Sequence, residues 1–177
     1  WSHDYLDTVL LEDVRSLTKI SDLDYLFDLY KLLPNFIGSP LSEQTLSTHL
    51  ELSFPTVKNY LKKFDQFYLA FRIKPYTKNI LRSILKASKC YLYNWSIISE
   101  PCYRFENFVA VELKTFTDFC SDLTWTNFSL HYIKNKEQKE TDFLISKNHQ
   151  PWLMIECKLS DQPLDAHHFE FQKQLGN

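Results

Sequence analysis

The sequence predicts a mixed α+β protein, in which a mainly helical first half precedes an α/β second half. Apolar residues between positions 4 and 33 recur at three- and four-residue steps, which is helical spacing. Three strand-like runs, at 129–133, 141–146 and 152–159, follow one helical segment and precede another. With 177 residues, 44% of them hydrophobic, the chain can bury one good core or two small ones. Composition excludes a disordered protein.

The sequence also favours a cytoplasmic location. No run of about 18 apolar residues occurs, and residues 1–4 lack the basic start of a signal peptide. Four widely spaced cysteines form neither a CxxC pair nor a disulfide framework, which is typical of a reducing compartment. The sequence does not begin with methionine, since Met154 is the only one, and residues 174–177 do not form an obvious terminal element. We therefore expect a fragment of a larger protein, cut at both ends.

Residues 1–35 are expected to form a helical lead-in of two helices. Ser21 and Asp22 can cap the second helix, and Pro34 and Gly38 end it. Residues 36–90 are then expected to form a winged-helix-like domain. Its first short helix spans 43–49, with Ser42 as N-cap.

The second short helix, at 56–64, places lysines on its outer face. The inner face is expected to contain Val57, Tyr60, Leu61 and Phe64. Two short helices about five residues apart, followed by the β-rich run 67–73 and a long loop over 75–89, resemble a helix-turn-helix with a wing. The alternative, a helical linker whose lysines are merely solvated, stays open.

Charge is distributed unevenly along the chain, although the net charge is only -2. Residues 1–55 contain nine acids and three bases, whereas residues 56–90 contain nine bases and one acid, Asp65. Such a basic stripe favours an anionic partner, DNA first of all. The expected nucleic-acid contacts are Lys58, Lys62, Lys63 and Arg72.

Residues 91–177 are expected to form a second domain, with the boundary near residue 90. A helix at 105–116 begins it, and a turn at 147–151 joins the last two strands. A helix at 166–175 ends it. The apolar side of the first helix is expected to contain Phe105, Phe108, Val109, Leu113 and Phe116.

Two carboxylates and a lysine are expected to converge in this second domain. Because side chains alternate along a strand, Glu156 and Lys158 share a face with Trp152 and Met154, at the end of a strand that should be largely buried. Asp142, in the preceding strand, faces Glu156 if the hairpin loop holds an odd number of residues.

Such a cluster suits phosphodiester hydrolysis. Asp142 and Glu156, with the carbonyl of Cys157, could hold Mg²⁺ through oxygen ligands. Lys158 could orient the attacking water, and Glu106 could complete the site. The alternative is a salt bridge on a strand. A metal site at His167 and His168 is not expected, because adjacent histidines point in different directions on a helix. We expect both side chains to be solvated.

The ordered series of motifs resembles the C-terminal region of prokaryotic AAA-superfamily ATPases, which is called domain of unknown function 4143. The resemblance covers nearly the whole chain. It is carried by residues 56–61, 71–76, 91–96, 104–110, 140–145 and 156–160.

This resemblance implies a winged helix followed by a restriction-endonuclease-like domain with a PD-(D/E)xK motif, truncated at its C-terminus. The motif falls on Glu106, Asp142, Glu156 and Lys158. ATP would bind only in a P-loop domain preceding Trp1, and no GxxxxGK[ST] occurs in this chain. Asn94 departs from the pattern, because similar sequences often have an acid there.

Two functions follow as hypotheses. The first is a nucleic-acid-binding, nuclease-like region with Mg²⁺ as cofactor. The second is an inactive interaction or regulatory module that binds a partner protein or controls the ATPase. Neither hypothesis involves a membrane.

Overall fold

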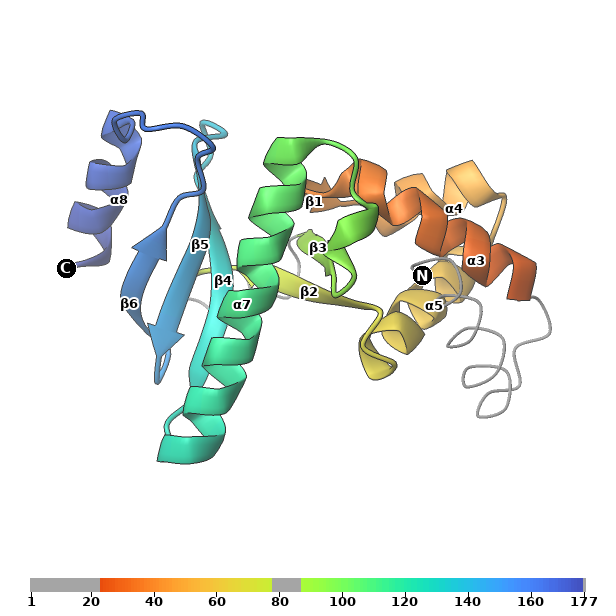
Figure 1. The fold of residues 1–177 in the computed structure, drawn as a ribbon, viewed down its shortest axis with the longest axis horizontal. Coiled ribbons are helices and arrows are strands. Elements are labelled where there is room, and N and C mark those ends of the chain that lie inside the picture. The colour runs from red at the N-terminus through yellow and green to blue at the C-terminus, as the bar shows by residue number, and fades with distance from the viewer. Residues whose placement is uncertain (1–22, 78–86, 177) are drawn as a thin grey trace.

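The structure is a computed structural model that describes residues 23–77 and 87–176 (Figure 1). Within these residues, five α-helices accompany a mixed six-stranded sheet, so the expected α+β class is confirmed. The helix expected before Ser21 and the side chains of Lys78, Arg82 and Lys86 lie outside the described residues. None of the described helices is long and apolar enough to cross a membrane.

The first three helices follow the expected pattern closely. They are α3 (Leu23–Leu32), α4 (Glu43–Leu50) and α5 (Phe54–Gln66), and a short 3₁₀ helix at Leu33–Phe36 follows α3. Ser42 caps α4 as expected, because its hydroxyl accepts a 3.2 Å hydrogen bond from the backbone N–H of Thr45. The predicted inner face of α5 is also confirmed, since Val57, Tyr60, Leu61 and Phe64 are all buried.

A single sheet runs through the described part of the chain, in the order β1-β3-β2-β4-β5-β6. β2 and β4 pair in parallel, and the other neighbours pair antiparallel. The domain boundary expected near residue 90 falls within β3, which also contains the end of the expected 75–89 loop. The strands are β1 (Pro40–Leu41), β2 (Ala70–Pro75), β3 (Ser88–Leu92), β4 (Phe128–Lys134), β5 (Glu140–Lys147) and β6 (Gln150–Ile155).

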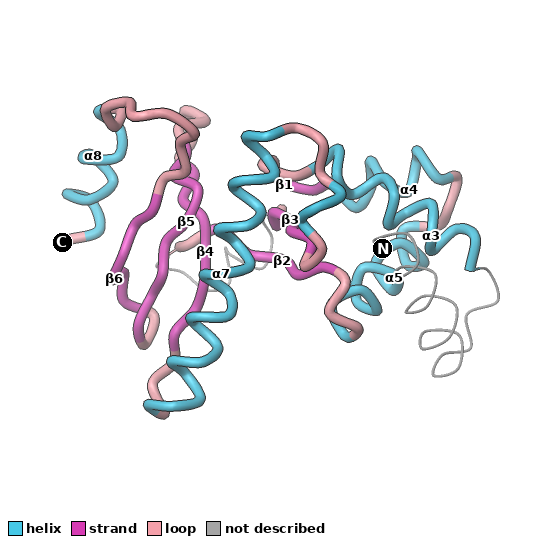
Figure 2. The backbone as a smooth tube through the Cα atoms, viewed as in Figure 1, coloured by secondary structure: helices cyan, strands magenta, loops and turns pink. Residues whose placement is uncertain are grey.

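Two helices cover opposite faces of the sheet (Figure 2). α7 (Pro101–Thr124) contributes Ala110 to the main core, together with Phe143 and Ile145 of β5. α8 (Ala166–Leu175) contributes Phe171 to a smaller cluster with Leu144. Because Phe143 and Leu144 are neighbours in one strand, their side chains point to opposite faces.

The helix expected at 105–116 exists within α7, but its predicted apolar face is wrong in part. Phe108 and Phe116 are 38% and 41% exposed, whereas Glu106 and Asn107 are buried. Asn107 is held there by the backbone of Leu92. Its Nδ2 donates to the Leu92 carbonyl at 2.6 Å, and its Oδ1 accepts from the Leu92 N–H at 2.9 Å. The side chain thereby satisfies backbone groups at the end of β3.

Candidate functional site

The β5–β6 hairpin sets the position of Glu156. Its turn contains two residues, Asn148 and His149, and both have positive φ, as a type I′ turn requires. The condition under which Asp142 was expected to face Glu156, an odd number of loop residues, is therefore not met. One extra residue, Trp152, lies between the pairs Ser146–Pro151 and Ile145–Leu153, forming a β-bulge. This bulge shifts the register by one residue, so that Asp142 still comes opposite Glu156.

A second bulge sets the position of Asp142. Asp142 and Phe143 of β5 together lie opposite Tyr132 of β4, because the register shifts between the flanking pairs. Both side chains of such a bulge can turn toward the same face. Asp142 therefore joins Phe143 on the α7 side of the sheet, where its Oδ1 lies 3.9 Å from Nζ of Lys89.

Two hydrogen bonds hold the carboxylates of Asp142 and Glu156 near each other. The backbone N–H of Asp142 donates to Oε2 of Glu156 at 3.3 Å, and the backbone N–H of Cys157 donates to Oδ2 of Asp142 at 2.9 Å. Burial raises the pKa of Asp142, the Cys157 N–H lowers it, and the negative charge of Glu156 raises it further. The two carboxylates therefore interact electrostatically.

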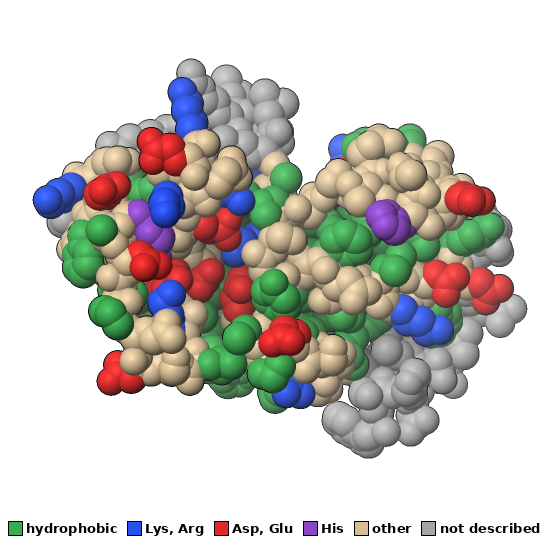
Figure 3. Space-filling model, turned by 90° about the horizontal axis from the view of Figure 1, so that it is seen from above, with side chains coloured by type: hydrophobic (Ala, Val, Ile, Leu, Met, Phe, Trp, Pro, Cys, Tyr) green, Lys and Arg blue, Asp and Glu red, His purple; other side chains and the backbone are tan. Residues whose placement is uncertain are grey.

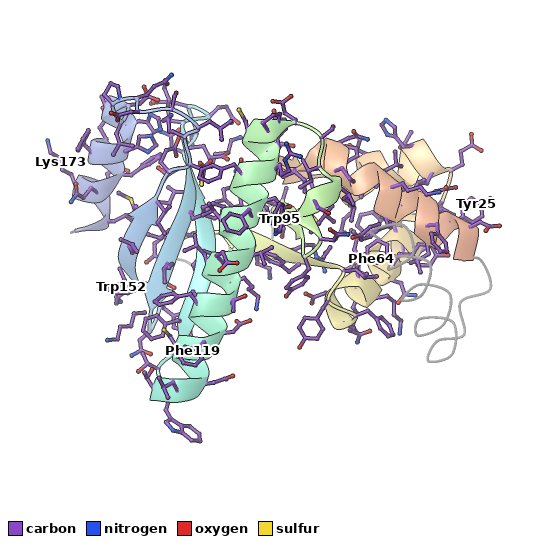
Figure 4. The ribbon with its side chains drawn as sticks, in the orientation of Figure 1. Tyr25, Phe64, Trp95, Phe119, Trp152 and Lys173 are labelled. Atoms are coloured by element: carbon purple, nitrogen blue, oxygen red, sulfur yellow. The ribbon has the colours of Figure 1, made fainter. Side chains whose placement is uncertain are left out.

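The surroundings of Glu156 differ from the expectation in two ways. β6 ends at Ile155, so Glu156 and Lys158 follow the strand instead of belonging to it. β6 is also the edge of the sheet, and Trp152 and Leu153 are about half exposed rather than buried. Trp152 packs against Phe116 of α7, whereas Met154 packs in the cluster on the α8 face, because the bulge breaks their alternation. Figure 4 shows the side chain of Trp152 on β6, and it labels Phe119 on the neighbouring helix α7.

Lys158 contacts Glu156 directly, whereas Glu106 interacts with Asp142 through its charge. Nζ of Lys158 lies 3.3 Å from Oε1 of Glu156, and the lysine side chain is 29% exposed. Glu106 is buried on α7, and its Oε1 accepts a 2.8 Å hydrogen bond from the hydroxyl of Tyr91. Burial raises the pKa of Glu106. Gly38 packs close to it, since a Cβ at this position would lie 3.2 Å from Oε2 of Glu106.

Lys89 is the site residue that the sequence interpretation missed. Its side chain is fully buried, and its Nζ lies 3.2 Å from Oε1 of Glu106 and 2.5 Å from Oε1 of Glu140. Burial lowers the pKa of Lys89, but the charges of Glu106, Glu140 and Asp142 outweigh it and raise the pKa overall. One signal could have identified it. Lys89 stands in the strand-like run 88–92, where a buried ammonium needs a carboxylate partner.

Glu140 was missed for a similar reason. It precedes Asp142 by two residues in β5, a spacing that places both on one face of a strand. Oε2 of Glu140 also lies 3.2 Å from Nζ of Lys134. The cluster at this site thus contains three ammonium groups and four carboxylates, which belong to Lys89, Lys134, Lys158, Glu106, Glu140, Asp142 and Glu156. Figure 3 shows acidic side chains gathered with Lys or Arg on the α8 side of the molecule.

The four expected nucleic-acid contacts are not equivalent. Lys58 and Lys62 are exposed one turn apart on α5, whereas Lys63 is only half exposed. Nη1 of Arg72 forms a 2.9 Å salt bridge with Oε1 of Glu43. Lys58 and Arg72 line a pocket of about 780 Å³ between the α4–α5 pair and the β2–β3 strands, and Lys62 and Lys63 are not among its lining residues.

The expectation that His167 and His168 are solvated is wrong. His168 is 4% exposed, and the two imidazole rings lie 3.9 Å apart between centroids. They stand in the first turn of α8, which begins at Ala166 after the N-cap Asp165, and the helix packs on β5. His168 contacts Thr141 of β5 through a 2.8 Å hydrogen bond between Nδ1 and Oγ1.

Comparison with known proteins identifies one family. A family model described as "Domain of unknown function (DUF8612)" matches residues 1–100. Comparison with curated proteins and with solved structures finds no match. The matched segment includes α3 to β3 and Lys89, and it ends before α7, which contributes Glu106.

Proposed function

The chain belongs to the family described as a domain of unknown function (DUF8612), whose model matches more than half of it, and we propose that it is a nucleic-acid-binding, nuclease-like protein. In this proposal, Asp142, Glu156 and Lys158 form a site for Mg²⁺-dependent phosphodiester hydrolysis, and Glu106 supports them. The observation that carries the proposal is that backbone hydrogen bonds, from Asp142 to Glu156 and from Cys157 to Asp142, hold two carboxylates together with Lys158 beside them.

The residues present fit Mg²⁺. This ion prefers oxygen ligands, keeps several waters, and commonly uses only one or two protein carboxylates. Asp142 and Glu156 supply two such carboxylates, and their mutual repulsion contributes to the raised pKa of Asp142. A divalent cation would offset that repulsion. When bound, Mg²⁺ would polarise the phosphate and acidify a bound water.

The remaining groups would position the reactants and balance charge. Lys158 is partly exposed beside Glu156, so its ammonium could meet a phosphate oxygen or orient the attacking water. Lys89 neutralises part of the charge of Glu106 and Glu140, which limits the repulsion that an anionic substrate would meet. Exclusion of water by the α7 side of the site would strengthen these interactions.

The first part of the chain would bind the nucleic acid. The order α3-β1-α4-α5-β2-β3, with β1, β3 and β2 adjacent in the sheet, supports a winged-helix interpretation. Lys58 and Lys62 on the exposed side of α5 would contact phosphates. Arg72 would contribute less, because Glu43 already pairs with its guanidinium. DNA is the partner we propose, with contacts mainly to its backbone.

The finer resemblance belongs to the same proposal. Residues 91–177, with Asp142 and the Glu156–Lys158 pair, would be a restriction-endonuclease-like unit of a AAA-superfamily ATPase. ATP would bind in a domain of the longer protein that precedes Trp1. The strand–turn–strand order with Glu106 on the preceding helix supports this proposal.

One observation favours a second function, that of a non-catalytic interaction or regulatory module. Lys89 already pairs with Glu106 and Glu140 and approaches Asp142. Its ammonium group therefore offsets negative charge of these carboxylates without any metal. In that case the carboxylates would stabilise the fold, and the exposed aromatic residues and lysines would dock a partner protein or the ATPase.

A cleavage assay separates the two functions. Labelled single-stranded DNA, double-stranded DNA and RNA are incubated with the protein and Mg²⁺ or Mn²⁺, with a chelator as blank. We expect Asp142→Asn and Lys158→Met each to lower the cleavage rate at least about a hundredfold, since each removes a group that acts in the transition state. Lys173→Met on the exposed side of α8 is the matched control and should leave the rate unchanged. Wild-type protein that cleaves none of these substrates would favour the interaction module.

A further inference from the structure

The first turn of α8 brings together three side chains that the proposed reaction does not use. Asp165, His167 and His168 each offer one ligand atom, and these atoms lie within 4.8 Å of one another. Across residues 23–77 and 87–176, no other set of three or more His, Cys, Asp or Glu residues meets that spacing. The carboxylates of Glu106, Asp142 and Glu156 do not form such a set.

In each imidazole, one ring nitrogen forms a hydrogen bond with β5 and the other ring nitrogen does not. Nε2 of His167 donates a 2.8 Å hydrogen bond to the carbonyl of Glu140, which leaves Nδ1 with its lone pair. Nδ1 of His168 bonds Oγ1 of Thr141 at 2.8 Å, which leaves Nε2. Histidines that bind metals almost always have the other ring nitrogen fixed in this way, since the bond sets the tautomer and orients the ring.

Nε2 of His168 is the second observation that points to a ligand. His168 is 4% exposed, and this nitrogen has no hydrogen-bond partner among the described residues. Oε1 of Glu156 lies 3.8 Å away, and a pocket of about 340 Å³ borders both residues, which gives an ion access.

We propose that Asp165, His167 and His168 bind a borderline divalent transition-metal ion, with Zn²⁺ as the leading case. Two imidazoles and a carboxylate form a ligand set that Zn²⁺ accepts, whereas Mg²⁺ prefers oxygen ligands alone. Three protein ligands leave a fourth tetrahedral position for water. The site is distinct from the Asp142–Glu156 pair proposed for Mg²⁺, and it stands whether or not that pair is catalytic.

The bound ion would tie α8 to the sheet. Both histidines already contact β5 through Thr141 and the carbonyl of Glu140, so an ion between them and Asp165 would clamp the start of α8 onto that strand. The clamp would also fix the helix beside Glu156. Zn²⁺ should therefore raise the thermal unfolding midpoint of the protein, because an ion that binds only the folded state stabilises it.

The test is Zn²⁺ calorimetry on tag-free, chelator-treated protein, with thermal unfolding measured in parallel. The variants are Asp165→Asn, whose carboxylate makes no side-chain cap bond, and His167→Gln, which retains a donor for the Glu140 carbonyl. His49→Ala and Cys102→Ser are controls, because both residues are exposed metal-ligand types distant in sequence from α8. His168→Ala is not used alone, since removing this buried ring could prevent folding.

We expect one Zn²⁺ per wild-type chain, at least tenfold weaker binding in each of the two site variants, and unchanged binding in both controls. Zn²⁺ should raise the unfolding midpoint of the wild type but not of His167→Gln. Absence of saturable Zn²⁺ binding to the wild type, or equal affinity in the site variants, would overturn the proposal. A parallel Mg²⁺ titration distinguishes the two metal sites, since His167→Gln should leave Mg²⁺ binding intact and Asp142→Asn should leave Zn²⁺ binding intact.

Discussion

The backbone N–H of Cys157 donates a 2.9 Å hydrogen bond to Oδ2 of Asp142, so the segment that follows β6 holds this carboxylate of β5 in place. A second hydrogen bond runs from the backbone N–H of Asp142 to the carboxylate of Glu156. Each carboxylate is thus positioned by the backbone next to the other. A shift of one residue in the β5–β6 register would separate them.

Lys89→Met should destabilise the protein. The substitution removes the buried ammonium, which leaves the charge of Glu106 without an ammonium partner and that of Glu140 with Lys134 alone. Removing one partner of a buried ion pair costs about 3–5 kcal/mol in the free energy of unfolding. The measurement is urea denaturation, with Lys173→Met as the surface control, expected within about 0.5 kcal/mol of the wild type.

A double variant shows whether the loss arises from charge. Lys89→Met combined with Glu106→Gln should recover part of the lost stability, because one of the stranded carboxylates is then neutral. A Lys89→Met protein as stable as the wild type would contradict the assigned role of Lys89.

Lys58→Ala/Lys62→Ala should weaken DNA binding and reduce its salt dependence. Each lysine that neutralises a phosphate contributes about one unit to the slope of log K against log salt, so the double variant should lose about two units. The measurement is fluorescence anisotropy with labelled duplex DNA between roughly 50 and 200 mM salt. Lys136→Ala/Lys173→Ala, at exposed positions elsewhere, is the control. Equal slopes in both double variants would locate the DNA contacts outside α5.

Stability should fall steadily as the pH rises from about 9 to 12. Burial raises the pKa of Cys90 from 9.0 to about 12 and that of Tyr132 from 10.0 to about 12. The folded state therefore keeps protons that the unfolded state has already lost, and this linkage favours unfolding as the pH rises. Each such group contributes about 1.4 kcal/mol per pH unit within its window.

Chemical denaturation in the presence of a reductant, at several pH values, measures this decline. Cys90→Ala should show a shallower decline above pH 9.0 than the wild type, because one of the contributing groups is gone. Parallel declines for the two proteins would show that Cys90 does not titrate as its burial implies.

The local structure could be predicted well from the sequence. Apolar spacing identified α4 and α5, Ser42 identified the cap of α4, and the strand-like runs identified β4 and β5 within two residues of their bounds. These features depend on neighbours in the chain, which a sequence shows directly.

The long-range features could not be predicted in the same way. The bulges at Trp152 and at Asp142–Phe143 depend on how three strands fit together, and no local residue pattern marks them. The polar buried face of α7 was missed because Glu106 and Asn107 are satisfied by β3, which is distant in the sequence. Lys89 was counted in the basic stripe expected to favour an anionic partner, since only tertiary contacts distinguish a buried lysine from an exposed one.

Calorimetric titration of Mg²⁺ tests the central claim most directly. Wild-type protein is compared with Asp142→Asn/Glu156→Gln, which preserves side-chain size and hydrogen-bonding capacity while removing both charges. His167→Gln is titrated as a control for the neighbouring histidine pair. The proposed site predicts saturable binding to the wild type and to His167→Gln, and none to the double variant. Absence of Mg²⁺ binding to the wild type, or undiminished binding to the double variant, would contradict it.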